Sequence, residues 1–154
     1  MASTFLLIVI ALAAFAPLVT RYGPAEQDLT NILGGSSGDH WLGTDDLGRD
    51  VWTRLVYGAR VSLQASSIAV GVAFVIGVPI GLVAGFAGGW VDTVLMRVVD
   101  TLLAFPAIVL AVGVTAALGP GLVNAMVAVG VVFSPSFARL MRGQVLATRG
   151  ACSW

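Results

Sequence analysis

The sequence contains no lysine, so all eight of its basic residues are arginine. A Walker A phosphate loop and a pyridoxal Schiff base both need a lysine, so we expect no ATP hydrolysis of that kind by this chain alone. It has a single cysteine, Cys152, which excludes an internal disulfide, and a single histidine, His40, which argues against a zinc site of Cys and His ligands. Its formal net charge of zero indicates no nucleic-acid partner. We expect no catalytic residue, no cofactor and no metal ligand.

Charge of either sign is scarce. Only 10% of the residues are charged and 58% are hydrophobic, whereas an average soluble domain is about 25% charged. A soluble fold of this length would not hide long apolar blocks and still present a polar surface. The composition therefore predicts an all-α membrane protein in the lipid bilayer.

Four apolar blocks follow one another along the chain. They are residues 2–20, 61–88, 101–118 and 122–138, and the last is shorter than ideal and interrupted at Ser134-Pro135-Ser136. About 20 residues at about 1.5 Å each cross a hydrocarbon core of about 30 Å, so we expect about four transmembrane helices. A secretory signal peptide is the alternative for the first block, although its basic flank is missing.

Three arginines follow the last apolar block: Arg139, Arg142 and Arg149. No acidic residue accompanies them, so the positive-inside rule places this end in the cytoplasm. With four crossings the amino terminus is cytoplasmic too, and residues 21–60 are extracytoplasmic. This predicts a multi-pass membrane protein with both termini in the cytoplasm.

Glycines recur at every fourth position of the second block, at Gly77, Gly81 and Gly85. Such a stripe lets another helix approach the backbone closely in lipid, where no hydrophobic force drives helices together. We predict that this face packs against protein; the alternative is that glycine is simply common in membrane helices. Pro79 should kink the helix or lie where a neighbour satisfies the freed carbonyl.

Three charges, Asp92, Arg97 and Asp100, precede the third block. A spacing of three residues favours a pair between Arg97 and Asp100. We interpret these charges as interfacial anchors, with a polar patch that faces protein as the alternative.

The most charged stretch runs from His40 to Leu63, HWLGTDDLGRDVWTRLVYGARVSL. On a helical wheel, residues 46–60 separate a polar side from an apolar side. Thr44 is suited to be the N-cap, and Asp45–Arg49 and Asp50–Arg54 have the spacing of helical ion pairs. We predict an amphipathic helix that lies on the outer membrane surface or on a neighbouring subunit; a solvated helix without a partner is the alternative.

This stretch closely resembles the segment before the membrane core in the peptide and nickel family of ABC-transporter permeases, of the dipeptide permease C type. GWVDTVLMRVVDTLLAFPAIVLAV and SFARLMRGQVLAT are similar to later parts of that family, in the same order. The residues that carry the family motif and the predicted amphipathic helix are Gly43, Thr44, Asp45, Asp46, Gly48, Arg49, Asp50 and Arg60.

The resemblance implies a type I ABC importer permease fold, a place in a bacterial or archaeal cell (inner) membrane, and a set of partners. A homologous second permease would complete the translocation path, two cytoplasmic ATPase subunits would supply energy, and an extracytoplasmic binding protein would deliver a dipeptide, an oligopeptide or nickel. Pro79, Phe105 and Pro106 are the residues that we expect to shape the path. A small membrane scaffold or assembly protein without a substrate path is the alternative function.

The resemblance ends at about Thr148. In the family, a cytoplasmic coupling loop with an E-A-A pattern and two more helices follow, whereas this sequence reads ATRGACSW. We therefore expect an incomplete copy of the fold that does not couple to an ATPase alone. The expected organisation is a first transmembrane helix (1–20), an extracytoplasmic loop with the amphipathic helix (21–60), a partial permease core with three spans (61–148) and an atypical tail (149–154).

Overall fold

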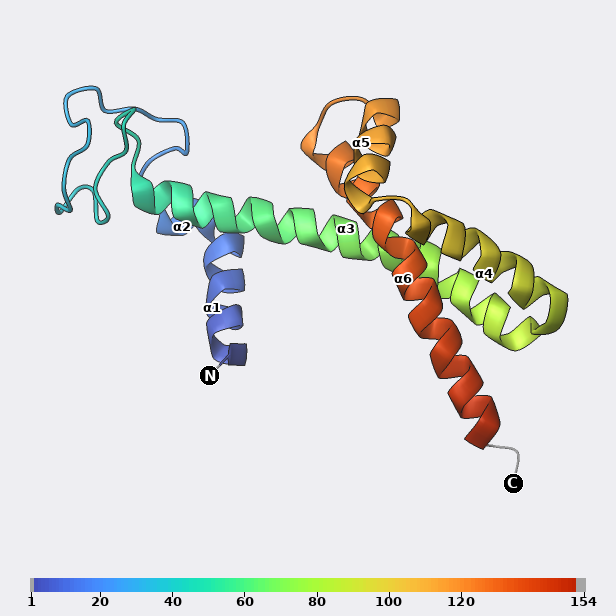
Figure 1. Cartoon of the computed structure of the whole chain (residues 1–154). Helices are drawn as coiled ribbons and strands as arrows, with labels where there is room; N and C mark the ends of the chain where they lie inside the picture. Colours follow the sequence, from blue (N-terminus) through green and yellow to red (C-terminus); the bar gives the residue numbers. More distant parts are fainter. Residues whose placement is uncertain (1, 152–154) are drawn as a thin grey trace. The chain divides into compact units, whose positions relative to one another are not determined.

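The structure, a computed structural model, describes residues 2–151, which form helices and one long loop between Val19 and Val51. The order of helices is α1 (Ala2–Ala14), α2 (Ala16–Val19), α3 (Val51–Ala87), α4 (Gly89–Ala104), α5 (Ala107–Leu118) and α6 (Leu122–Ala151). Figure 1 shows them along the chain. The residues group into two compact units that meet at Gln64 and Ala65 in the sequence, and each unit is described by itself below.

The first apolar block forms two helices, not the single span expected for residues 2–20. The 13-residue α1 is followed at once by the short α2, whose first turn holds Pro17. Proline suits a helix start because it has no backbone N–H to leave unpaired. At about 1.5 Å per residue, α1 is about 20 Å long, which is less than the thickness of a hydrocarbon core.

The 37-residue helix α3 contains the second block and is the longest element. It passes through Pro79 as one helix and has the length and hydropathy to cross a membrane. It begins at Val51, so the helix expected over residues 46–60 starts later than the wheel predicted. Residues 51–60 of the predicted amphipathic helix form the first turns of α3, and the same helix continues into the spanning segment.

The third block does not form a straight span. Helices α4 and α5 are each too short to qualify alone and meet at an angle of 96°, at the break that contains Phe105 and Pro106. Proline has no N–H to donate and disfavours helical geometry in the residue before it, so α4 ends where it does. The pair is either a broken span or a re-entrant loop.

The fourth block continues well beyond its apolar residues. Helix α6 has 30 residues and runs through Pro135, so the interruption expected at Ser134-Pro135-Ser136 is wrong. Among residues 2–151, two helices are long and apolar enough to cross a membrane, or three spans exist if α4 and α5 count as one. The expected number of four spans is therefore not reached on length and composition.

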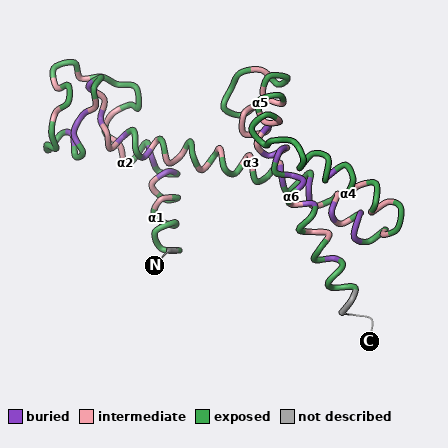
Figure 2. Tube along the Cα trace, viewed as in Figure 1, coloured by how far each residue is buried: buried purple, intermediate pink, exposed green. Residues whose placement is uncertain are grey.

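In the second unit, the buried positions belong mostly to small residues of α3 and α6. Ala73, Ala84, Ala128 and Ala138 are each at most 2% exposed. Figure 2 shows these buried segments, in purple, where α3 and α6 lie side by side. Small side chains bring the two backbones close, which is the packing mode of helices in lipid.

Candidate functional site

The loop before α3 folds back on an earlier part of itself through the motif residues. The side chain of Thr44 donates to the carbonyl of Asn31 and accepts a 2.8 Å hydrogen bond from the amide of Gly34. Thr44 is therefore a buried bridge inside the loop and not the N-cap of a helix. Its oxygen satisfies two backbone groups that water would otherwise have to reach.

Two glycines of the motif have backbone conformations that other residues rarely adopt. Gly43 has φ +78° and Gly48 has φ +70°. A Cβ at Gly48 would also lie 2.7 Å from the backbone carbon of Asp28. Glycine is needed at both positions because only it combines left-handed geometry with so close an approach of two chain segments.

The carboxylate of Asp45 accepts hydrogen bonds from four donors, three in the turn that follows it and one on α3. The amides of Leu47 and Arg49 and the Nε of Arg49 each donate over 2.9 Å, and the guanidinium of Arg54 donates as well. Burial favours the neutral acid, but the amide and guanidinium donors outweigh it and hold the pKa of Asp45 well below its usual range. The predicted pair of Asp45 with Arg49 is present, in a turn and not on a helix.

Asp50 is the residue that caps α3. Its Oδ2 accepts a 2.8 Å hydrogen bond from the amide of Thr53, and its Oδ1 lies 3.0 Å from Nδ1 of His40. Burial raises the pKa of Asp50, but the Thr53 amide and His40 lower it by more, so its pKa lies below the usual value. The predicted pair of Asp50 with Arg54 is wrong, because Arg54 pairs with Asp45.

The two remaining motif residues, Asp46 and Arg60, lie outside this network. Asp46 is exposed in the turn before α3, and Arg60 is partly exposed on α3. His40, Tyr22 and Asn31 are the partners that the wheel did not identify. The single histidine, in an otherwise charged stretch, is the sequence feature that could have indicated a buried hydrogen-bond partner for Asp50.

The glycine stripe faces α6 in the second unit. A Cβ on Gly77 or Gly81 would strike the backbone carbonyl of Ser134 or Ala138, and one on Gly85 would lie 2.7 Å from Cβ of Val145. From the opposite side, Gly130 of α6 lies so close to α3 that its Cβ would be 2.6 Å from Cβ of Val72. Sequence reasoning missed Gly130, because it is a lone glycine among apolar residues.

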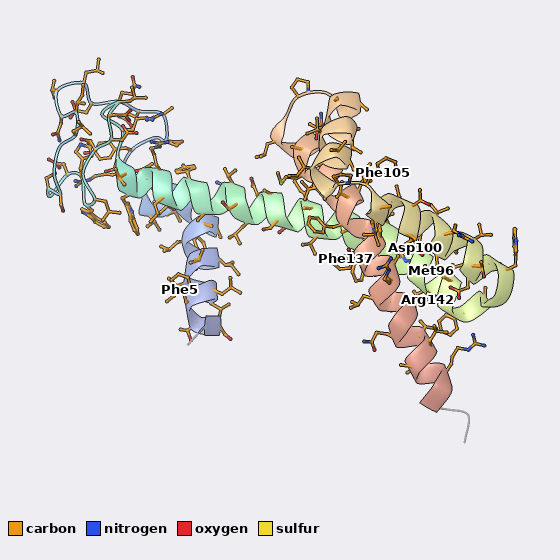
Figure 3. The ribbon with its side chains drawn as sticks, in the orientation of Figure 1. Phe5, Met96, Asp100, Phe105, Phe137 and Arg142 are labelled. Atoms are coloured by element: carbon orange, nitrogen blue, oxygen red, sulfur yellow. The ribbon has the colours of Figure 1, made fainter. Side chains whose placement is uncertain are left out.

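Arginines of α6 connect that helix to its neighbours. Arg142 makes a two-pronged ion pair with Asp92 of α4, with Nη2 at 2.6 Å from Oδ2, and Arg139 pairs with Asp100 at 2.6 Å. Arg149 donates to the carbonyls of Gly85 and Phe86 at the end of α3, each over 3.0 Å. Figure 3 shows Arg142 and Asp100 in the region where α4 and α6 lie together.

Two expectations about these charges change. Asp100 pairs with Arg139 and not with Arg97, because α4 packs against α6. Asp92 and Asp100 are also more than interfacial anchors, since both face a neighbouring helix. The path-shaping candidates Phe105 and Pro106 lie at the 96° break, and Pro79 lies inside α3 between Gly77 and Gly81.

These contacts build and orient helices. Among residues 2–151, no three His, Cys, Asp or Glu side chains are placed to hold a metal ion. In the loop, Asp45 and Asp50 bind the amides of a turn and of the start of α3, and the arginines of α6 join helices. The arrangement therefore has a structural role in each unit, in which it holds loop segments and helices against one another.

Comparisons with known proteins agree on one class. Residues 77–151 match the family model described as the inner membrane component of binding-protein-dependent transport systems. The chain is 49% identical over 140 residues to the dipeptide transport system permease protein of Alkalihalophilus pseudofirmus, covering 91% of this chain and 46% of the relative. It is 43% identical over 146 residues to the glutathione transport system permease protein of Pectobacterium atrosepticum, covering 94% and 48%.

A third relative has a related description. The chain is 37% identical over 147 residues to the probable D,D-dipeptide transport system permease protein of Escherichia coli, covering 96% of this chain and 49% of the relative. The chain thus spans about half the length of the curated relatives that it matches. The matched region includes both the loop before α3 and the α3–α6 interface.

Proposed function

Because the chain belongs to the family of inner membrane components of binding-protein-dependent transport systems, we propose that it is a permease subunit of an ATP-driven importer of short peptides. The observation that carries this proposal is 49% identity across nearly the whole chain to a dipeptide permease. The spanning helix α3, with its glycine face on α6, supports it, since a permease needs tightly packed helices around a path.

The proposed substrate class is dipeptides and other short peptides. The relatives' names specify a dipeptide, a D,D-dipeptide and glutathione, which is itself a tripeptide. Nickel, the other cargo of the resembling family, has no such support here. We therefore place peptides ahead of nickel as cargo.

We propose that the path runs beside the bent α4–α5 segment. The break at Phe105 and Pro106 interrupts backbone hydrogen bonding, which in a membrane is tolerated only against protein or beside a water-filled cavity. Broken helices also provide unpaired backbone groups for binding polar substrates in other transporters. A path lined by this break would present such groups to a peptide.

Energy and delivery require other subunits in this proposal. A homologous second permease would close the path, ATPase subunits would bind on the side of the arginine-rich end of α6, and a binding protein would deliver peptide on the opposite side. Residues 21–50 would then lie outside the cell, with both termini in the cytoplasm. Alternating access follows if ATP binding favours one of two arrangements of the helices.

The test is co-expression of the tagged full-length version of this chain with the second permease, ATPases and binding protein from the same genome. We expect the second permease and the ATPases to co-purify, and proteoliposomes to take up labelled dipeptide only with ATP and binding protein. Parallel assays with glutathione and with nickel distinguish the cargo. Purification without either partner would overturn the proposal and favour a scaffold or assembly role.

A further inference from the structure

His40 is buried between two carboxylates of the loop before α3. Its side chain is 7% exposed, its Nδ1 lies 3.0 Å from Oδ1 of Asp50, and its Nε2 lies 4.0 Å from Oδ2 of Asp28. The ring of Tyr22 stacks on the imidazole at a centroid distance of 4.8 Å. Glu26 lines the same hollow and is the remaining acidic group near the ring.

The histidine is connected directly to the start of α3. Asp50 uses one oxygen for His40 and the other for the amide of Thr53, so a single carboxylate joins the ring to the helix cap. The amide of Val51 also donates to the carbonyl of Gly43, which ties the loop to the first residue of the helix. His40 is therefore linked to the cap of α3 through one carboxylate.

The two contacts of the ring differ in what they require. The 3.0 Å contact is satisfied by a neutral imidazole that carries its proton on Nδ1. The 4.0 Å contact is too long for a hydrogen bond, and a neutral ring presents a lone pair there to a carboxylate. Only the imidazolium form has a positive Nε2–H to direct at Asp28.

We propose that His40 is a proton-sensitive latch that holds the segment around Asp28 against the N-terminal cap of α3. When protonated, the ring bridges Asp28 and Asp50; when neutral, it keeps Asp50 and releases Asp28. Histidine is the side chain that proteins commonly use as a pH-dependent switch, which suits such a latch. Loop closure thus depends on protons.

A purely structural histidine would not need the second carboxylate. One carboxylate is enough to fix the tautomer and orientation of a neutral ring. The 44% exposed Asp28 contributes no cap to α3, and its other oxygen is occupied by Thr30. Its Oδ2 lies opposite Nε2, where the charged form of the ring would place a positive N–H.

The test uses the full chain in detergent micelles with 15N-labelled histidine. Since His40 is the only histidine, its ring nitrogen signals report protonation and tautomer without assignment. Hydrogen exchange of amides 22–30 is measured on the same samples from pH 5.5 to 8 and corrected for the intrinsic pH dependence of exchange. We expect protection to fall about tenfold with rising pH, at the same midpoint as the ring.

The variant Asp28→Asn removes the second contact and is expected to abolish the step, while Nδ1–H remains bound to Asp50. Its matched control is Glu26→Gln, a change in the same hollow that should leave the step in place. A protection profile that is the same in the wild type and Asp28→Asn overturns the latch, as does a ring that titrates with no change in protection. Neither readout uses transport, so a failed transport assay leaves the latch standing.

Discussion

In the loop before α3, side-chain oxygens of Thr44, Asp45 and Asp50 bind backbone amides, whereas between α3 and α6 the closest approaches are made by glycines, which have no side chain. The loop is shaped by directional hydrogen bonds whose partners are specific atoms. The helix interface depends on glycines, whose lack of a side chain lets the two backbones approach closely. The two regions should therefore respond to different perturbations, the first to the loss of an acceptor or a proton and the second to added bulk.

The largest expected effect is on the helix interface. In Gly81→Leu, the Cβ of the new side chain would strike the carbonyl oxygen of Ala138 and lie 2.8 Å from Cβ of Met141. The backbone of α6 would have to move to relieve these clashes. We expect a loss of about 3 kcal/mol in the free energy of unfolding, at the upper end of overpacking effects. Unfolding by SDS in mixed micelles measures it.

The matched control for this change is Gly71→Leu in the same helix, where no atom lies within 4 Å of the added Cβ. It should cause no loss of stability, because leucine has a higher helix propensity than glycine. Equal losses at the two positions would mean that contact with α6 does not determine the effect.

The next largest effect is on the cap of α3. Asp50→Ala removes the acceptor of the Thr53 amide and leaves the buried His40 without its 3.0 Å partner. A lost cap costs about 1 kcal/mol and a buried unpaired donor about as much, so we expect the loop and first turn to lose about 2 kcal/mol. Hydrogen exchange at the Thr53 amide measures this directly.

Asp46→Ala is the control, because Asp46 is exposed in the same turn. We expect no more than about 0.5 kcal/mol. An equal effect of both substitutions would show that general negative charge near the helix start, and not the cap geometry, stabilises α3.

The sequence was informative about the helix interface and misleading about the loop, for one physical reason. A contact stripe such as Gly77, Gly81 and Gly85 repeats with the helix period, so its pattern alone indicates a packed face. The loop has no period, and its hydrogen bonds join Thr44 to Asn31 and His40 to Asp50 across turns. A wheel applied to residues 46–60 therefore placed the cap at Thr44, although Asp50 is the cap.

The break between α4 and α5 and the pairing of their charges could also not be obtained from spacing. Pro106 marks a possible break, but its 96° bend depends on the packing of α5 and α4 against α6. Once α4 is placed, Asp100 faces Arg139 on another helix, 39 residues away in sequence. Rules for neighbours on one helix predict only partners three or four residues apart.

Low pH should destabilise the loop before α3 more than the interface between α3 and α6. Asp45 and Asp50 have pKa values lowered by folding, so their stabilising contribution is fully present above the unfolded value of about 3.9 and is lost as pH falls through the lower folded values. We expect loop amides to lose protection progressively between about pH 4 and pH 2, while amides of α3 that face α6 keep theirs.

Hydrogen exchange across that pH range measures the effect, with Asp45→Asn as the comparison. That variant should be less stable at pH 6 but lose less on acidification, because one of the linked protons is gone. A loop that is equally protected at pH 5 and pH 2 would contradict the role assigned to the two carboxylates.

The smallest expected effects are within the arginine contacts of α6 and distinguish a partly buried pair from an exposed one. Double-mutant cycles with Asp92→Asn and Arg142→Gln, and with Asp100→Asn and Arg139→Gln, compare the two pairs through SDS unfolding. The side chains of Asp92 and Arg142 are 17% and 32% exposed and meet in two contacts, whereas those of Asp100 and Arg139 are 58% and 57% exposed. Exposed pairs typically contribute about 0.2 to 1 kcal/mol, so the coupling energy should be larger for the partly buried Asp92 with Arg142. Equal couplings would mean that the surrounding lipid and water, and not the geometry of the pair, determine how strongly α4 is held to α6.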